Sequence, residues 1–388
     1  MRPRLVLLVA GAVFAASVYT SAQRQGGIPV PDLTPAQRQA FDEGSRVFAK
    51  RYTVADGLGP VFNDDSCADC HRNGGGSNRT VQRFGRTDRG QFDALEYLGG
   101  SLIQSRGIGS VTTTDGTHVF LAERVPPEAS VTALRRSTPL VGLGFIDAVP
   151  DDTWLAIADQ ERRADPSTAG SPQRAFNAAT GAFVVGKFGW KAQVPTLRQF
   201  AGDAMLNEMG ITSPGFRDEI CPQGDCLALA FNPTPALNDD GRDQAAMTDF
   251  MTMLDVPARG PITTDVLSGE RVFQDIGCET YHRATIQTGS SAIRALDRVD
   301  VHPYSDFLLH SMGALGDGIT QGLADGFAMR TSPLWGLRAA TRFLHDGSAA
   351  TLEQAIRRHD GQARASRERF DALNADQLAW LLAFLRSL

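Results

Sequence analysis

Apolar residues recur at helical spacing in several stretches of the chain, and this pattern predicts its main helices. The first helix opens at Thr34-Pro35, a favourable N-cap followed by proline at the first helical position, and its apolar face includes Phe41 and Phe48. Further stretches with the same spacing predict helices over residues 152–162, 196–209, 241–254 and 375–388. We therefore expect a mainly α-helical protein.

One region, residues 95–150, departs from helical spacing. Within it, Val111-Thr112-Thr113-Thr114 and His118-Val119-Phe120-Leu121 flank Asp115-Gly116, a pair typical of a tight turn. This pattern predicts a β-hairpin in a β-containing segment.

The N-terminus carries Arg2 and Arg4, then an apolar run over residues 5–18, then Thr20-Ser21-Ala22. A charged start, an apolar run and small residues are typical of a signal peptide, and we predict that residues 1–22 are removed. An uncleaved anchor is the alternative. No second long apolar run follows, so we expect a periplasmic or secreted chain with no stable membrane span after cleavage.

The residues Cys67-Ala68-Asp69-Cys70-His71 form a C-x-x-C-H motif, which is the attachment signature of haem c. Both thiols can form thioether bonds with the vinyl groups of one haem, and His71 can then bind the iron as proximal ligand. A zinc half-site or a surface disulfide would use the same residues. Zinc needs a second Cys/His pair at matching spacing, and the sequence has no other C-x-x-C.

A short internal repeat divides the chain. Gly269-Glu-Arg-Val-Phe273 restates Gly44-Ser-Arg-Val-Phe48, and each copy leads into a Cys…His element. Each half also ends on an amphipathic helix, and residues 256–261 are rich in Pro and Gly, as a linker would be. We therefore predict tandem cytochrome c-type domains, residues 23–255 and 256–388, with the β-containing insertion in the first.

Charge and cysteine usage limit the partners and the compartment. Cys221 and Cys226 enclose Pro-Gln-Gly-Asp and are expected to form a disulfide in an oxidising compartment. The net charge is −6 and becomes −8 without Arg2 and Arg4. This balance argues against a nucleic-acid partner and is compatible with a basic redox partner.

Five stretches resemble the bacterial di-haem oxidoreductases, some of which are named thiol oxidoreductases. This family is related to the di-haem cytochrome c peroxidases and to the di-haem enzyme that matures methylamine dehydrogenase. The stretches are Cys67–His71, Lys187-Phe-Gly-Trp-Lys-Ala192, Asp306-Phe-Leu-Leu-His-Ser-Met-Gly313, Pro333-Leu-Trp-Gly-Leu337 and Phe343-Leu-His-Asp-Gly-Ser-Ala-Ala-Thr-Leu-Glu-Gln-Ala-Ile356.

The resemblance implies a second haem at Cys278-Glu-Thr-Tyr-His282, but Tyr281 stands where the family has its second cysteine. Three outcomes are open: a haem held by one thioether through Cys278, a haem held without a covalent bond, or no haem at all. The resemblance also implies that His282 is the proximal ligand and His359 the distal ligand of this second iron. A solvent-facing helix histidine is the alternative for His359.

The resemblance suggests roles for several other residues. Met312 would be the distal ligand of the first iron, with His310 or an open iron as alternatives. Trp190 would relay electrons between the haems, or would only fill a packing site.

The other residues would lie around the cofactors. His345 would lie near a haem propionate, and Arg338 and Arg342 would pair with propionates unless they are ordinary surface arginines. Some relatives hold calcium between domains; the candidates here, Asn78 and Asp255, form no recognisable calcium loop, and calcium stays an open possibility.

The function implied by the resemblance is electron transfer coupled to peroxide reduction, with electrons from a small periplasmic cytochrome c or cupredoxin. A non-catalytic electron carrier, and an oxidase of a sulfur compound or a protein side chain, are the alternatives. A third class, a protein with one haem that acts as a binding partner, is raised by Tyr281.

Overall fold

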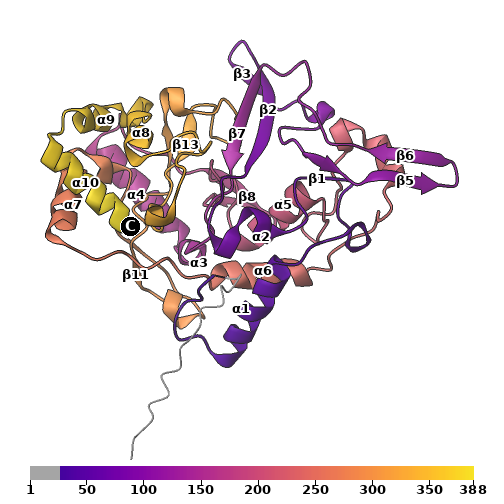
Figure 1. Ribbon diagram of the computed structural model, residues 1–388, viewed down its shortest axis with the longest axis horizontal. Helices are drawn as coiled ribbons and strands as arrows, with labels where there is room; N and C mark the ends of the chain where they lie inside the picture. The colour runs from indigo at the N-terminus through magenta and orange to yellow at the C-terminus, as the bar shows by residue number, and fades with distance from the viewer. Residues whose placement is uncertain (1–26) are drawn as a thin grey trace, which may run out of the picture.

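The structure is a computed structural model that describes residues 27–388 (Figure 1). The predicted signal peptide lies outside these residues. The described part contains ten α-helices, which are α1 (Pro35–Phe48), α2 (Cys67–Cys70), α3 (Leu143–Asp147), α4 (Asp151–Ala164), α5 (Leu197–Met209), α6 (Arg242–Thr252), α7 (Thr264–Asp275), α8 (Leu352–Arg357), α9 (Arg364–Asp371) and α10 (Ala375–Ser387).

Within residues 27–388 the strands form six small antiparallel sheets. One has three strands in the order β3-β2-β7, and the others pair β1-β4, β5-β6, β8-β9, β10-β11 and β12-β13. The strands are β1 (Val61–Phe62), β2 (Thr80–Asp88), β3 (Gln91–Asp93), β4 (Arg106–Gly107), β5 (Gly109–Thr113), β6 (Gly116–Phe120), β7 (Val131–Arg136), β8 (Arg174–Asn177), β9 (Ala182–Val185), β10 (Ile286–Gln287), β11 (Asp300–Val301), β12 (Leu309–Ser311) and β13 (Ala328–Arg330).

The predicted helices and the predicted hairpin are present. Thr34 caps α1 through a reciprocal capping box with Gln37, as a Thr-Pro start favours. The hairpin is β5–β6, in which Val111 lies opposite His118. These elements were predictable because their signals are local: a cap, a tight turn and a regular apolar spacing.

The expectation of a mainly α-helical protein is wrong in part, because helices and small sheets share the fold. The strands also extend beyond the predicted insertion, since β10 to β13 all follow residue 256. All four of these strands are only two or three residues long. A strand this short has no period for sequence analysis to detect, and its pairing is set by the loops around it.

Two pairs of helices cross at unusually short distance, and each crossing is centred on a glycine. Gly44 on α1 faces the backbone of α6, where an added Cβ would collide with the carbonyl oxygen of Ala246. Gly269 on α7 faces α10, where an added Cβ would collide with the carbonyl oxygen of Trp380. Figure 1 shows the first pair at the bottom of the molecule and the second pair at its left.

The same aromatic arrangement follows each glycine. Phe48 lies 4.9 Å from Phe250 of α6 and 6.3 Å from the ring of His71, between ring centroids. Phe273 lies 5.2 Å from Phe384 of α10 and 6.2 Å from the ring of His282. The two helix pairs therefore place a histidine in the same way, although they are more than two hundred residues apart in the chain.

The larger hydrophobic core does not follow the predicted domain boundary at residue 256. It is built around α1, α4, α5 and α6, and it also includes Phe307, Leu308 and Trp335 from the C-terminal half. A second, smaller core surrounds α7 and α10. The two halves therefore share buried apolar surface.

Two further findings concern the cysteines and the membrane. Cys221 and Cys226 are joined by a disulfide, with Cα atoms 4.4 Å apart, whereas Cys67, Cys70 and Cys278 take part in no disulfide. No helix within residues 27–388 combines the length and the apolar character that crossing a membrane requires.

Replacing either crossing glycine should destabilise the protein. In Gly44→Ala and Gly269→Ala the new methyl group meets a backbone carbonyl that cannot rotate away, so the helices must separate, at a cost of about 1–3 kcal/mol. Gly215→Ala is the control, because no atom lies within 4 Å of its added Cβ. Denaturant unfolding of the three variants measures the difference, and equal stabilities would refute the close crossing.

Candidate functional site

The first motif folds as one helical turn. Ser66 precedes α2, and the amide of His71 donates to the carbonyl of Cys67 at 3.0 Å, so one helical turn and its C-cap carry both thiols and the imidazole. Burial raises the pKa of the Cys67 thiol to about 12 and lowers the pKa of His71 to about 4, so the thiol is protonated and the imidazole neutral. Nδ1 of His71 is buried with no hydrogen-bond partner among residues 27–388.

The second motif repeats this turn with one replacement. The amide of His282 donates to the carbonyl of Cys278 at 2.9 Å, as in the first motif. Tyr281 occupies the position of the missing cysteine and is 8% exposed; its hydroxyl donates to the carbonyl of Gln362 at 2.6 Å. The tyrosine is therefore a fixed part of the wall and leaves Cys278 as the only thiol of this motif.

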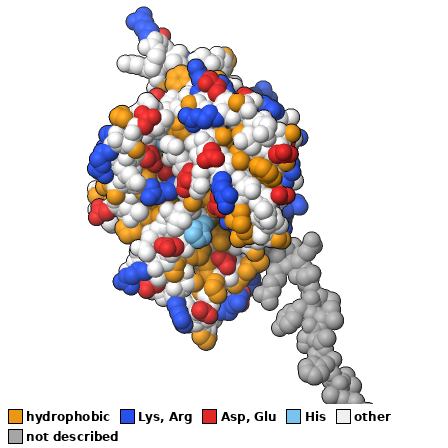
Figure 2. All heavy atoms as spheres, turned by 90° about the vertical axis from the view of Figure 1, so that its left-hand side faces the viewer, with side chains coloured by type: hydrophobic (Ala, Val, Ile, Leu, Met, Phe, Trp, Pro, Cys, Tyr) orange, Lys and Arg blue, Asp and Glu red, His pale blue; other side chains and the backbone are white. Residues whose placement is uncertain are grey.

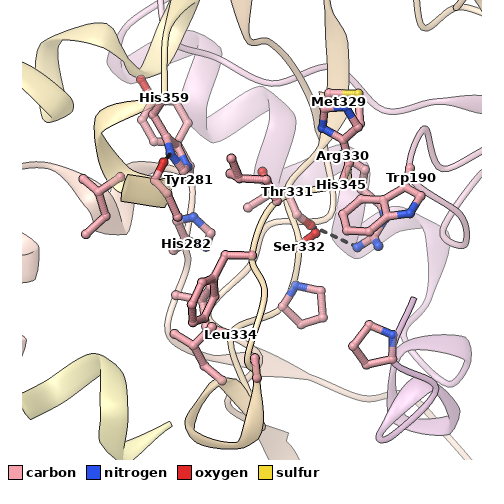
Figure 3. A pocket seen from close by; sticks show the side chains of 18 of the residues that line it. Trp190, Tyr281, His282, Met329, Arg330, Thr331, Ser332, Leu334, His345 and His359 are labelled. Atoms are coloured by element: carbon pink, nitrogen blue, oxygen red, sulfur yellow. Dashed lines mark hydrogen bonds between the residues drawn. The ribbon is translucent and has the colours of Figure 1, made fainter. Parts of the chain in front are cut away.

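A large cavity of about 1870 Å³, its open mouth included, lies beside the second motif. Figure 3 shows His282, His359 and Tyr281 on one side of it and Trp190, Arg330 and His345 on the other. Most of the wall is apolar, and Phe273 and Leu385 contribute to it from the α7–α10 pair. A cavity with this lining accepts a large and mostly apolar ligand.

The two cavity histidines have the form that a metal ligand needs. Nδ1 of His282 bonds the carbonyl of Tyr304 at 2.9 Å, and Nδ1 of His359 bonds the carbonyl of Ala355 at 2.8 Å. A carbonyl only accepts, so each Nδ1 carries the proton and each Nε2 keeps its lone pair. Burial lowers the pKa of His282 to about 4, and it lowers the pKa of His359 as well, so both rings are neutral.

The charges around the cavity have one sign only. Arg136, Arg330, Arg342 and Arg367 line it, and no aspartate or glutamate does. Arg367 pairs with Asp360, but the other three have no carboxylate partner within the described part of the chain. In a protein with net charge −6, unpaired arginines around an apolar cavity fit an apolar ligand with carboxylate groups.

Burial makes this positive charge costly unless a ligand balances it. Arg330 is 7% exposed, and desolvation lowers its pKa to about 10. Desolvation also lowers the pKa of Arg136. Backbone carbonyls hold both side chains in place: Arg330 Nε donates to Gly189, and Arg136 Nε donates to Ser77 at 3.3 Å. Haem satisfies these requirements, since it combines an apolar macrocycle, an iron that binds imidazole and two propionates.

A family model described as "Di-haem oxidoreductase, putative peroxidase" matches residues 121–388, which is more than half of the chain and includes the second motif. The chain belongs to this di-haem oxidoreductase family. It is therefore a haem-dependent oxidoreductase, which confirms the resemblance drawn from the sequence. No curated protein sequence matches the chain.

Several solved structures are similar to this chain at low identity. A hydrazine synthase of Kuenenia stuttgartiensis is 14% identical over 100% of both chains, with a TM-score of 0.43. The diheme peroxidase BthA of Burkholderia thailandensis E264 is 17% identical over 92% of this chain and 86% of its own, with a TM-score of 0.43. A MauG-like protein associated with microbial copper homeostasis is 18% identical over 93% of each chain, with a TM-score of 0.41.

Several residues singled out in the sequence line the cavity of this di-haem oxidoreductase. Trp190 and Met312 lie in the wall with His282 and His359, whereas Cys67, Cys70 and His71 do not line it. The assignment of Met312 to the first iron stays a prediction. Trp190 is fixed by a hydrogen bond of 2.8 Å from its indole nitrogen to the carbonyl of Arg136.

The remaining predicted residues lie in different surroundings. His345 is buried, and its ring lies edge-on to Trp190 at 6.2 Å. Arg342 lines the cavity, but Arg338 is exposed, does not line it and donates to the carbonyl of Ala258.

The calcium candidates have partners of their own. Asn78 contacts the hydroxyl of Thr341 at 3.4 Å, and Asp255 accepts from the amide of Val256. Calcium stays untested.

Sequence analysis missed Arg136, Arg330 and Trp335. Trp335 lines the cavity, and its indole nitrogen is buried with no partner in the part of the chain that the structure describes. Trp335 lies in one of the stretches that resemble the family, so the resemblance could have identified it as a cavity residue. Arg136 ends β7 and Arg330 ends β13, and no local pattern indicates that these two strand ends face one cavity.

Removing an unpaired arginine should weaken haem binding in the cavity. We expect Arg136→Gln and Arg330→Gln to lower haem retention about tenfold, because each loses a charge-assisted hydrogen bond to a propionate. The reduction potential of this haem should also fall, since a cation near the iron favours the reduced state. Arg338→Gln is the matched control outside the cavity, and spectroelectrochemistry of the three variants measures both effects. Identical potentials would contradict the assignment.

Proposed function

We propose that this chain is an exported di-haem c-type oxidoreductase in which electron transfer is coupled to the reduction of hydrogen peroxide. The observation that carries the proposal is a difference between the two histidine motifs. His282 shares its cavity with a second neutral imidazole, His359, whereas every other histidine is engaged away from His71. A site with two imidazoles suits electron transfer, and a site with one suits reaction with a small molecule.

The histidines can be accounted for one by one. The chain has seven. His118 stacks on Phe231, Nδ1 of His302 bonds the hydroxyl of Thr285, Nε2 of His310 bonds Asp306, and His345 lies against Trp190. The ring contact of His71 in residues 27–388 is with Phe48. Met312, the methionine predicted as distal ligand of the first iron, lines the cavity of the second motif. These observations support a first iron that keeps an exchangeable position.

The residues that would hold the two haems follow from the motifs. Cys67 and Cys70 would form two thioethers and His71 would bind the first iron. Cys278 would form the one thioether of the second haem, with His282 and His359 as axial ligands. When bound, these haems supply one-electron transfer and peroxide reduction.

The protein's own groups prepare this chemistry. The three unpaired arginines would balance the charge of the propionates. The apolar wall excludes water, which strengthens this electrostatic attraction. The carbonyls of Tyr304 and Ala355 hold the two cavity imidazoles in one tautomer. Trp190, fixed at its indole nitrogen, is the residue that we assign to electron relay between the sites.

The repeated helix crossings support the tandem arrangement, with cytochrome c-type units over residues 23–255 and 256–388 and an insertion in the first. We assign the chain to the periplasm because of its N-terminal pattern. A small cytochrome c or cupredoxin is the proposed donor. On the face around α9 and α10, acidic and basic side chains are interspersed (Figure 2). A donor that docks on this face would therefore meet no patch of uniform charge.

The second haem should be held by one thioether. On protein matured in a host that assembles haem c, we expect two irons per chain and a pyridine haemochrome band displaced from the two-thioether position. Tyr281→Cys should restore the ordinary band, because it recreates both attachment points. One iron per chain with an ordinary band would show a vacant second site.

Peroxide reduction needs an open iron, which carbon monoxide reports. We expect the ferrous protein to bind one carbon monoxide per chain and to oxidise a reduced cytochrome c when peroxide is added. His359→Ala should open the second iron and raise the stoichiometry to two. Absence of both carbon monoxide binding and turnover in the wild type would leave a non-catalytic electron carrier.

A further inference from the structure

Three metal-ligating side chains meet outside the haem ligands described above. Glu161 projects from α4, Asp306 precedes β12 and His310 lies within β12. One ligand atom from each lies within 4.8 Å of the other two. Asp306 is fully buried, His310 is 2% exposed and Glu161 is partly buried.

The cluster combines two carboxylates with one imidazole. Asp306 and Glu161 form no ion pair with lysine or arginine within the described residues, and the nitrogen Nε2 of His310 is the group that contacts Asp306, at 2.9 Å. Arg283 and Arg330 act on the cluster only from a distance. Burial, followed by the charge of Asp306, raises the pKa of Glu161 to about 7.

Burial lowers the pKa of His310, but the charge of Asp306 and the hydrogen bond to it outweigh burial and raise this pKa overall, so a proton on the imidazole is one way to offset the carboxylates. Nε2 of His310 already faces Asp306, and Nδ1 is buried with no hydrogen-bond partner in the described part of the chain. A metal ion bound at Nε2 is the alternative to this proton, because it brings positive charge to both carboxylates at once. A cation between the carboxylates and Nε2 would remove the repulsion and leave Nδ1 unchanged.

We propose that Glu161, Asp306 and His310 bind one divalent transition-metal ion of the zinc class. A tetrahedral zinc ion holds its ligands at about 2.0–2.1 Å, and two such ligands therefore lie about 3.4 Å apart. Nε2 of His310 and Oδ2 of Asp306 lie 2.9 Å apart, which is a hydrogen-bond distance, so the ion would replace this bond after a shift of about 0.5 Å. An imidazole with two carboxylates suits zinc or manganese better than calcium, which takes oxygen ligands, or copper(I), which takes sulfur.

The surroundings hold these side chains in place for binding. The amide of Gly170 donates to Oε2 of Glu161 at 2.9 Å, and the amide of Leu308 donates to Oδ1 of Asp306 at 2.9 Å. Gly170 also leaves room for the ring, since an added Cβ would lie 2.6 Å from Nε2 of His310. Such supporting bonds orient metal ligands and raise their affinity.

The ion would stabilise the second motif through the contacts of its ligands with Tyr281. The amide of Asp306 donates to the carbonyl of Tyr281 at 3.0 Å, and the ring of His310 lies edge-on to that of Tyr281 at 5.0 Å. The site does not depend on the proposed peroxide chemistry, because none of its three ligands binds haem in that proposal.

The test uses the full-length haem-loaded protein, stripped with a chelator and titrated with zinc chloride by calorimetry. We expect one zinc ion per chain. In Glu161→Gln and Asp306→Asn the affinity for zinc should fall by about tenfold or more. Asp159→Asn is the matched control, since Asp159 is exposed on the same helix and pairs with Arg162. Its affinity should equal that of the wild type.

X-ray absorption at the zinc edge identifies the ligands. A nitrogen and oxygen shell at about 2.0–2.1 Å supports the site, whereas a sulfur shell at about 2.3 Å would assign the zinc to cysteines and overturn it. Failure of Asp306→Asn to fold leaves Glu161→Gln decisive, because Glu161 is only partly buried. Absence of zinc binding in the wild type, or equal binding in Glu161→Gln, overturns the proposal.

Discussion

The close crossing of two helix pairs is the constraint on which the rest of the structure depends. At each crossing a glycine lets one helix touch the backbone of the other, α1 against α6 and α7 against α10. This contact fixes the phenylalanine one turn later, and that ring fixes the histidine that follows. Two short sequence repeats thus become two equivalent positions for an imidazole.

The cavity adds an electrostatic constraint to this geometric one. The protein is acidic overall, but the cavity beside the second motif is lined by arginines and by no carboxylates. Such a separation of charge is unfavourable unless a ligand brings negative charge into the cavity. Three independent properties of the cavity therefore indicate the same ligand: its apolar wall, its neutral histidines and its arginines.

Local features of this fold could be predicted from the sequence, and assembled features could not. The cap at Thr34, the β5–β6 hairpin and the two Cys…His elements depend on residues within a few positions of each other, so their patterns are visible in the chain. The arginine positions depend on strands β7 and β13, which lie far apart in sequence. Tyr281 was visible as a departure, but its hydrogen bond to Gln362 required the fold.

The smaller core has a consequence for the life of the protein in a cell. Phe273, Leu381 and Leu385 belong to the core around α7 and α10, and the same residues form the wall of the cavity. The ligand thus completes that core, and chains that lack it expose apolar surface to proteases. The amount of folded protein in the cell should therefore rise and fall with the supply of haem, and so with the supply of iron.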